Sequence, residues 1–138
     1  MIRKVFLDTN ILIDWITGRK PFVDHAEKIF ELHVEHGFDM YVSALSLANL
    51  AYTLDNQKVK PHESILLLLR WVKVVDLTRD IVAEAAESGF KDFEDGLQNY
   101  SAKTIMGVDA IVTRNKKDFK HSSMPILSPE ELIEMFEK

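Results

Sequence analysis

The chain has 138 residues, 46% of them hydrophobic and none of them cysteine, so it is long enough for one domain over residues 1–138 with a full core. This composition excludes a disordered chain, a fold held by disulfides and a zinc site made of thiolates. The net charge of −5, from 22 acidic and 17 basic residues, disfavours a protein that coats nucleic acid, but not an enzyme that contacts a few phosphates.

In chain order, short apolar segments predict strands over residues 5–7, 38–42, 72–75, 110–112 and 125–127. Helical spacing and stop signals predict helices over 10–16, 22–36, 43–54, 61–71, 79–88 and 93–106, and a last helix opening at 128–131. Strands separated by helices favour a parallel sheet, because parallel strands need long crossover connections. We therefore predict an α/β fold, a three-layer α/β/α sandwich with a parallel sheet of about five strands.

The sequence has no segment typical of membranes or secretion. Its longest apolar run, residues 65–69, is far shorter than the roughly 20 residues that span a bilayer. The first residues lack the apolar core and cleavage site of a secretory signal. We expect a cytoplasmic protein without a membrane partner.

Polar residues gather just after the predicted strands or where the predicted helices begin. The carboxyl ends of parallel strands share one sheet edge, where open α/β sheets bind ligands, so these groups can converge on one pocket. Carboxylates with amide and hydroxyl oxygens suit Mg²⁺ or Mn²⁺, which can assist phosphodiester hydrolysis. The converging residues are Asp8, Thr9, Asn10, Ser43, Asn49, Asp92, Asp95, Thr113, Arg114, Asn115 and Asp118.

Three segments together resemble a PIN domain. They are Asp8-Thr9-Asn10, the segment Asp-Phe-Glu-Asp at 92–95, and the segment Ile-Val-Thr-Arg-Asn-Lys-Lys-Asp-Phe at 111–119. PIN domains are metal-dependent ribonucleases that include the VapC-type toxins of toxin–antitoxin pairs. The resemblance covers nearly the whole chain. It implies an endoribonuclease that uses Mg²⁺ or Mn²⁺ on an RNA substrate and has a cognate antitoxin, and we expect a homodimer.

The resemblance also implies roles for matching residues. Asp8 resembles the first acidic metal ligand and Asp95 the third, while Thr113 resembles a hydroxyl residue that orients the acids. The predicted catalytic residues are Asp8, Asp95, Thr113 and Asn115. The predicted metal ligands are Asp8, Asp95, Asp92, Asp118 and Asn49, and the predicted substrate contacts are Asn10, Ser43, Arg114 and Lys116.

The sequence departs from the family pattern at Asn49, where the second acid, usually a glutamate, is expected. An asparagine carbonyl can bind Mg²⁺ but supplies neither a charge nor a base. This departure motivates a second hypothesis, a non-catalytic PIN-like module that binds RNA or a protein. A third is a phosphoaspartyl phosphatase, which would need a second aspartate at the position of Asn10.

Several of these residues also have ordinary structural interpretations. Asp8, Ser43 and Asp92 are all suited to cap helices, and Asp118 could be a turn residue. The basic residues Arg114, Lys116, Lys117 and Lys120 fit either phosphate contact or a solvated loop, with Arg114 the best suited to phosphate. Trp15, Trp71 and the leucines at 66–69 suit a core, a dimer surface or an antitoxin-binding surface.

Overall fold

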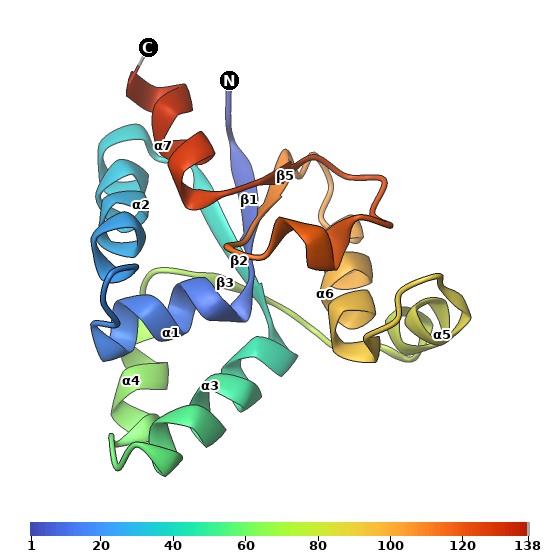
Figure 1. Ribbon diagram of the computed structural model, residues 1–138, viewed down its shortest axis with the longest axis horizontal. Helices are drawn as coiled ribbons and strands as arrows, with labels where there is room; N and C mark the ends of the chain where they lie inside the picture. Colours follow the sequence, from blue (N-terminus) through green and yellow to red (C-terminus); the bar gives the residue numbers. More distant parts are fainter. Residues whose placement is uncertain (138) are drawn as a thin grey trace.

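In a computed structural model that describes residues 1–137, five parallel strands form one sheet in the order β3-β2-β1-β4-β5. The prediction of a five-stranded parallel sheet is therefore confirmed. Figure 1 shows the sheet in the middle of the molecule. The strands are β1 (Lys4–Leu7), β2 (Asp39–Ser43), β3 (Lys73–Val75), β4 (Ala110–Val112) and β5 (Ile126–Leu127).

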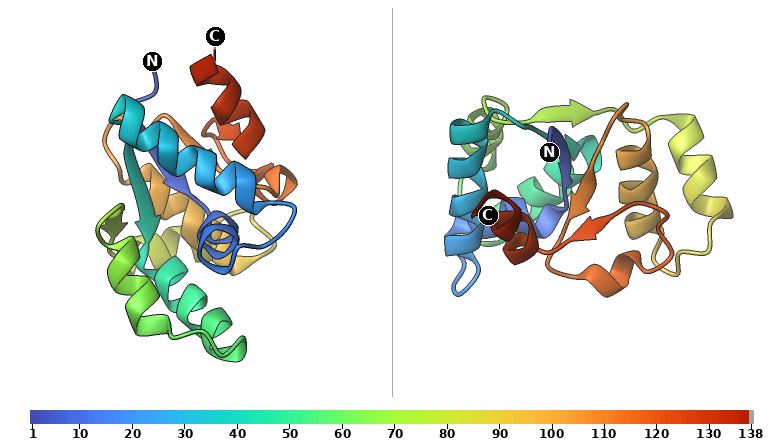
Figure 2. Two further views of the ribbon diagram at one scale, coloured as in Figure 1. Left: turned by 90° about the vertical axis from the view of Figure 1, so that its left-hand side faces the viewer. Right: turned by 90° about the horizontal axis from the view of Figure 1, so that it is seen from above.

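Helices cover both faces of the sheet, which gives the predicted three layers. Figure 2 shows α1 and α2 on one side and α5 and α6 on the other when the molecule is seen from above. The bounds are α1 (Thr9–Thr17), α2 (Val23–His36), α3 (Ala44–Asn56), α4 (Pro61–Leu68), α5 (Arg79–Glu87), α6 (Phe93–Lys103) and α7 (Pro129–Glu137), with a short 3-10 helix η1 (Lys116–Phe119).

Two helices end earlier than the sequence predicts. The helix expected over 93–106 ends at Lys103, because the backbone N–H of Thr104 bonds to Ser101 at 3.2 Å in a tighter last turn. Similarly, α4 ends at Leu68, and the N–H of Trp71 bonds back to the Leu68 carbonyl at 2.8 Å. Trp71 therefore lies outside the helix.

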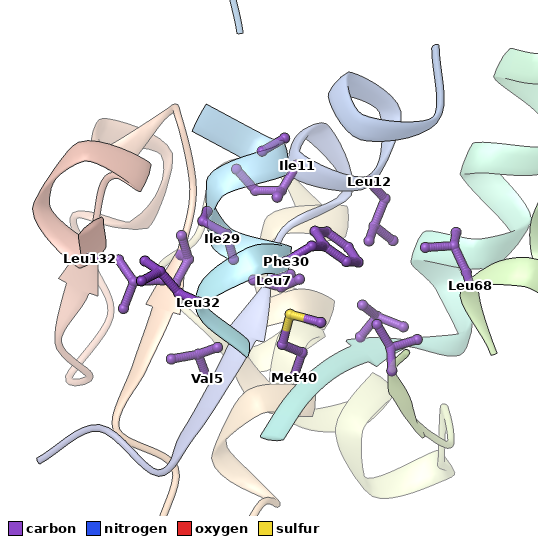
Figure 3. Close-up of a cluster of buried hydrophobic side chains, with 14 of the residues drawn as sticks. Val5, Leu7, Ile11, Leu12, Ile29, Phe30, Leu32, Met40, Leu68 and Leu132 are labelled. Atoms are coloured by element: carbon purple, nitrogen blue, oxygen red, sulfur yellow. The ribbon is translucent and has the colours of Figure 1, made fainter. Parts of the chain in front are cut away.

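Side chains of β1 alternate between the two halves of the core. Val5 and Leu7 pack into a cluster with α1, α2, α3, α4 and α7, and Figure 3 shows this cluster with both residues labelled. Phe6 points to the opposite face, where it packs with Ala102 and Ile111. These three apolar side chains of β1 are fully buried, as expected of a central strand covered on both sides.

The strand order changes direction at β1. From β1 the chain builds outward through β2 to β3, and it then crosses to the other side of β1 to form β4 and β5. Such a switch point leaves a crevice at the carboxyl edge of the two strands beside it, here β1 and β4. Asp8 and Thr113 follow these two strands directly and therefore lie at this crevice. No helix within residues 1–137 has the length and apolar character to cross a membrane.

Candidate active site

A pocket of about 270 Å³ opens at this crevice. Its walls come from the start of α1, from α3, from the start of α6 and from the segment after β4. Six of the predicted site residues line it, namely Asp8, Asn10, Asn49, Asp95, Asn115 and Asp118. The other lining residues are Thr9, Ile13, Leu45, Glu94 and Gln98.

Asp8 both caps a helix and lines the pocket. It is the N-cap of α1, and its Oδ1 accepts a hydrogen bond from the backbone N–H of Thr9 at 2.8 Å. Its Oδ2 accepts from the Thr113 hydroxyl at 2.7 Å and from the Asn10 amide at 3.3 Å. Burial raises the pKa of Asp8 above its usual value, although the bonds from Thr113 and Thr9 oppose that shift.

Thr113 fixes Asp8 from the end of β4. Its side chain is fully buried, and its hydroxyl donates to Asp8 while accepting from the Asn10 amide at 3.3 Å and the Asn115 backbone N–H at 3.1 Å. Thr113 does not line the pocket. It is placed to orient Asp8, Asn10 and Asn115 and lies behind the open surface.

Asp95 lies in the first turn of α6, at the opposite wall. Asp92 is the N-cap of this helix and accepts from the Asp95 backbone N–H at 3.2 Å. Burial, followed by the charges of nearby acids, raises the pKa of Asp95 to about 7. Those acids are Asp92, Asp118, Asp8 and Glu94. Because these carboxylates repel one another, the pocket favours a bound cation.

A buried polar network joins the three helices that carry the pocket. The Gln98 amide donates to Ser46 at 2.5 Å and to Thr9 at 3.0 Å, and its oxygen accepts from Ser43 at 2.5 Å. Thr9 and Ser46 share a further hydrogen bond of 2.8 Å. The network thus ties α1, α3 and α6 together beneath Asp8 and Asp95.

Four predicted site residues have neighbours that occupy their polar groups. Ser43 is fully buried, caps α3 through the Ser46 N–H and lies outside the pocket lining. Arg114 forms an ion pair with Asp14, at 2.6 Å, and Lys116 pairs with Glu131 at 2.8 Å. Asp92 caps α6 and lines a neighbouring cleft instead of this pocket.

The residue that the sequence prediction missed most clearly is Gln98. It lies three positions after Asp95 on α6, and this spacing places both on one helix face. Glu94 was also missed as a pocket residue, although it belongs to the segment 92–95. Ser46 has no sequence signal of its own, because its contacts with Thr9 and Gln98 are made across the fold.

The oxygen donors of this pocket fit a hard divalent cation. Within residues 1–137, no group of three or more His, Cys, Asp or Glu side chains is arranged to hold a metal ion by itself. Mg²⁺ commonly binds one or two carboxylates and keeps several waters, so Asp8 and Asp95 supply enough charge. The amide oxygens of Asn49 and Asn115 are neutral donors in the same pocket.

Comparison with known proteins identifies the fold and the family. The family model described as "PIN domain" matches residues 4–117. The structure resembles a chain of VapBC2 from Rickettsia felis bound to a DNA fragment from its promoter, with a TM-score of 0.69, 18% identity, and 91% of this chain and 98% of that chain covered. A toxin–antitoxin complex from Klebsiella pneumoniae gives a TM-score of 0.68 at 20% identity, with 91% and 97% covered.

A more distant structure is VapC20 from Mycobacterium tuberculosis, a toxin that cleaves the sarcin-ricin loop. It has a TM-score of 0.59 at 14% identity, with 78% of this chain and 86% of that chain covered. No curated protein matches this sequence. The chain belongs to the PIN domain family, as the three sequence segments predicted. Two of its structural neighbours, from Rickettsia felis and Salmonella typhimurium, are described as VapBC proteins, and the neighbour from Klebsiella pneumoniae is described as a toxin–antitoxin complex.

Proposed function

We propose that this protein is a metal-dependent endoribonuclease that hydrolyses RNA phosphodiester bonds and serves as the toxin of a toxin–antitoxin pair. The observation that carries the proposal is the convergence of Asp8, Asp95 and Asp118 on one pocket at the β1–β4 crevice. Family membership supports the reaction class. The elevated pKa of Asp95, at about 7, supports the presence of a cation in the working site.

Asp8 and Asp95 are the proposed ligands of a Mg²⁺ or Mn²⁺ ion, with Asp118, Asn49 and Asn115 as further oxygen donors, directly or through water. When bound, such an ion polarises a phosphoryl oxygen and lowers the pKa of a bound water. The chain's own contribution is orientation. The Thr113 hydroxyl donates to one carboxylate oxygen of Asp8 at 2.7 Å, which fixes the orientation of this carboxylate relative to the other oxygen donors of the pocket. Asp92, whose side chain caps α6, fixes the turn that carries Asp95.

Cleavage of a dye-labelled structured RNA in Mn²⁺, with EDTA as the control, tests the proposal. We expect cleavage with Mn²⁺ only, and a loss of about 100-fold or more in Asp8→Asn and Asp95→Asn. Asp55→Asn is the matched control, because Asp55 is an exposed acid outside the pocket. Equal cleavage by Asp8→Asn would rule out this mechanism.

The alternative is a non-catalytic PIN-like module, and Asn49 is the residue that favours it. Asn49 lines the pocket where the family usually has an acid, so the site has one negative charge fewer. Calorimetric titration with Mn²⁺ separates the two functions. Binding that disappears in Asp8→Asn supports a metal enzyme, whereas no binding by the unaltered chain supports the module.

The toxin assignment also proposes a protein partner. A second groove, of about 430 Å³, has an aromatic floor of Trp15, Phe30 and Trp71, and Glu27, Glu31 and Glu35 are among its other lining residues. Its acidic and apolar lining suits an antitoxin segment that is apolar and basic. The homodimer is a separate proposal, and light scattering of the purified chain at several concentrations tests it.

A further inference from the structure

A cleft of about 190 Å³, distinct from the aromatic groove, adjoins the acidic pocket that holds Asp8 and Asp95. Asp95 and Asp118 line both cavities, so the two meet at these acids. In place of further amides, this cleft has the basic side chains of Lys91, Lys117, Lys120 and His121. Its remaining lining residues are Phe90 and Asp92. We call the four basic residues the basic cleft residues.

The two walls of the cleft are held together by aromatic packing. Lys91 follows Phe90 in the segment before α6, and Lys117, Lys120 and His121 lie in or just after η1. The Phe90 ring packs edge-on against Phe119, with centroids 6.3 Å apart, and against His121 at 6.1 Å. Phe119 is buried in the core. The basic groups are therefore carried by backbone that is anchored next to Asp95 and Asp118.

The cleft lysines differ from the other basic residues of the same loop. Arg114 pairs with Asp14, and Lys116 pairs with Glu131. Within residues 1–137, no carboxylate lies within 4.0 Å of the ammonium groups of Lys91, Lys117 and Lys120. Lysines without an ion-pair partner within 4.0 Å in this part of the chain are thus gathered at one edge of the acidic pocket, in a cleft that they share with Asp92, Asp95 and Asp118.

We propose that the basic cleft residues bind the phosphate backbone of the RNA next to the scissile phosphate. This inference rests on the proposed function and specifies where the substrate runs. An RNA strand with one phosphate in the acidic pocket needs cations for the neighbouring phosphates, and the adjoining cleft supplies them. Lysine ammonium groups act as point charges on phosphate and read no sequence, so this contact adds affinity without base preference.

Binding in EDTA tests the cleft without any cleavage. The probe is a dye-labelled single-stranded RNA, and fluorescence anisotropy is measured over a KCl series. Two lost phosphate contacts weaken binding by about fivefold each at 0.1 M salt and reduce the slope of log K against log[salt] by about 1.4. We expect these changes in the double variant Lys117→Ala/Lys120→Ala. Lys91 lies on the opposite wall of the cleft, and Lys91→Ala should weaken RNA binding by about fivefold on its own.

Lys60→Ala is the matched control, because it removes one positive charge from an exposed lysine that lines neither cavity. Unchanged RNA binding in the double variant overturns the inference, as does an equal loss in Lys60→Ala. So does stronger competition by an acidic peptide than by unlabelled RNA, which would assign the cleft to a protein partner. If the protein binds RNA through the basic cleft residues but does not cleave it in Mn²⁺, the proposed nuclease function is wrong and the RNA-binding cleft stands. If the double variant cleaves RNA with an unchanged KM, the nuclease function stands and the RNA-binding cleft is wrong.

Discussion

The guanidinium of Arg114 donates two hydrogen bonds to the carboxylate of Asp14, at 2.6 and 3.1 Å. Its carbon also lies 3.8 Å from the centre of the Phe22 ring. The Asp14 side chain is only 1% exposed, so its negative charge depends on this one cation. The pair fastens the loop after β4 to α1. Arg114, which the sequence analysis favoured for phosphate contact, therefore has a structural partner that already occupies its charged group.

Arg114→Ala should lower the free energy of unfolding by about 3 kcal/mol, because it leaves the Asp14 charge buried without a partner. Urea denaturation at pH 7 measures this effect. Lys116→Ala is the control, since its pair with Glu131 is roughly half exposed and should contribute less than about 1 kcal/mol. If Arg114→Ala keeps its stability but loses RNA affinity, Arg114 contacts substrate and the structural assignment is wrong.

Gln98→Ala should cost about 2–3 kcal/mol of stability, because the hydroxyls of Ser43, Ser46 and Thr9 lose buried hydrogen-bond partners. The change should also lower RNA cleavage, since α6 and α1 would no longer be tied beneath Asp95 and Asp8. Thermal unfolding and the Mn²⁺ cleavage assay measure the two effects. Gln57→Ala changes an exposed glutamine at the end of α3 and should alter neither. A stable, fully active Gln98→Ala would show that the network does not position the site.

The strands, the parallel sheet and the pocket edge were predictable because each depends on local sequence. Val5, Phe6 and Leu7 are apolar at every position, as a strand covered on both faces requires, and Asp8 ends the run. Motifs at two strand ends and one helix start then identified Asp8, Asn115 and Asp95 as neighbours in space. The order of the strands could not be read in this way, because β1 lies between β2 and β4 through pairings that the sequence pattern does not encode.

Which basic residues are free could not be predicted, because pairing is set by distant parts of the chain. Asp14, the partner of Arg114, is 100 positions away in the sequence, and Glu131, the partner of Lys116, is 15 positions away. Both partners are ordinary acids in helical patterns. In contrast, Gln98 could have been found from sequence, since its spacing from Asp95 places it on the same face of α6.

Asn49→Glu should tighten Mn²⁺ binding by about tenfold or more, because it adds a negative charge to a pocket that already holds Asp8 and Asp95. Calorimetric titration gives the affinity directly. Asn56→Glu adds the same charge at the exposed end of the same helix and should leave the affinity unchanged. Equal affinities in all three proteins would mean that residue 49 does not face the ion.

Asp95 should make the metal-free protein less stable as the pH rises. Its pKa is raised from 3.8 to about 7 in the folded chain, mainly by burial and then by the neighbouring acids, so folding favours the protonated carboxyl. This stabilising contribution is complete below about pH 4 and is lost as the pH rises through about 7. In Asp95→Asn the side chain stays neutral, so the difference in unfolding free energy between variant and wild type should grow over this range in EDTA.

At pH 8, Mn²⁺ should reverse the order of stability of the wild type and Asp95→Asn. At pH 8 the ion binds the ionised pocket of the wild type and raises its unfolding temperature, whereas Asp95→Asn has lost one of its two proposed ligands and should gain less. Thermal unfolding with EDTA or Mn²⁺ at pH 5 and pH 8 measures all four states. Asp55→Asn should follow the wild type throughout. If Asp95→Asn and the wild type show the same pH dependence in EDTA, the acids of the pocket are not mutually repulsive, and the electrostatic argument for a cation at this site fails.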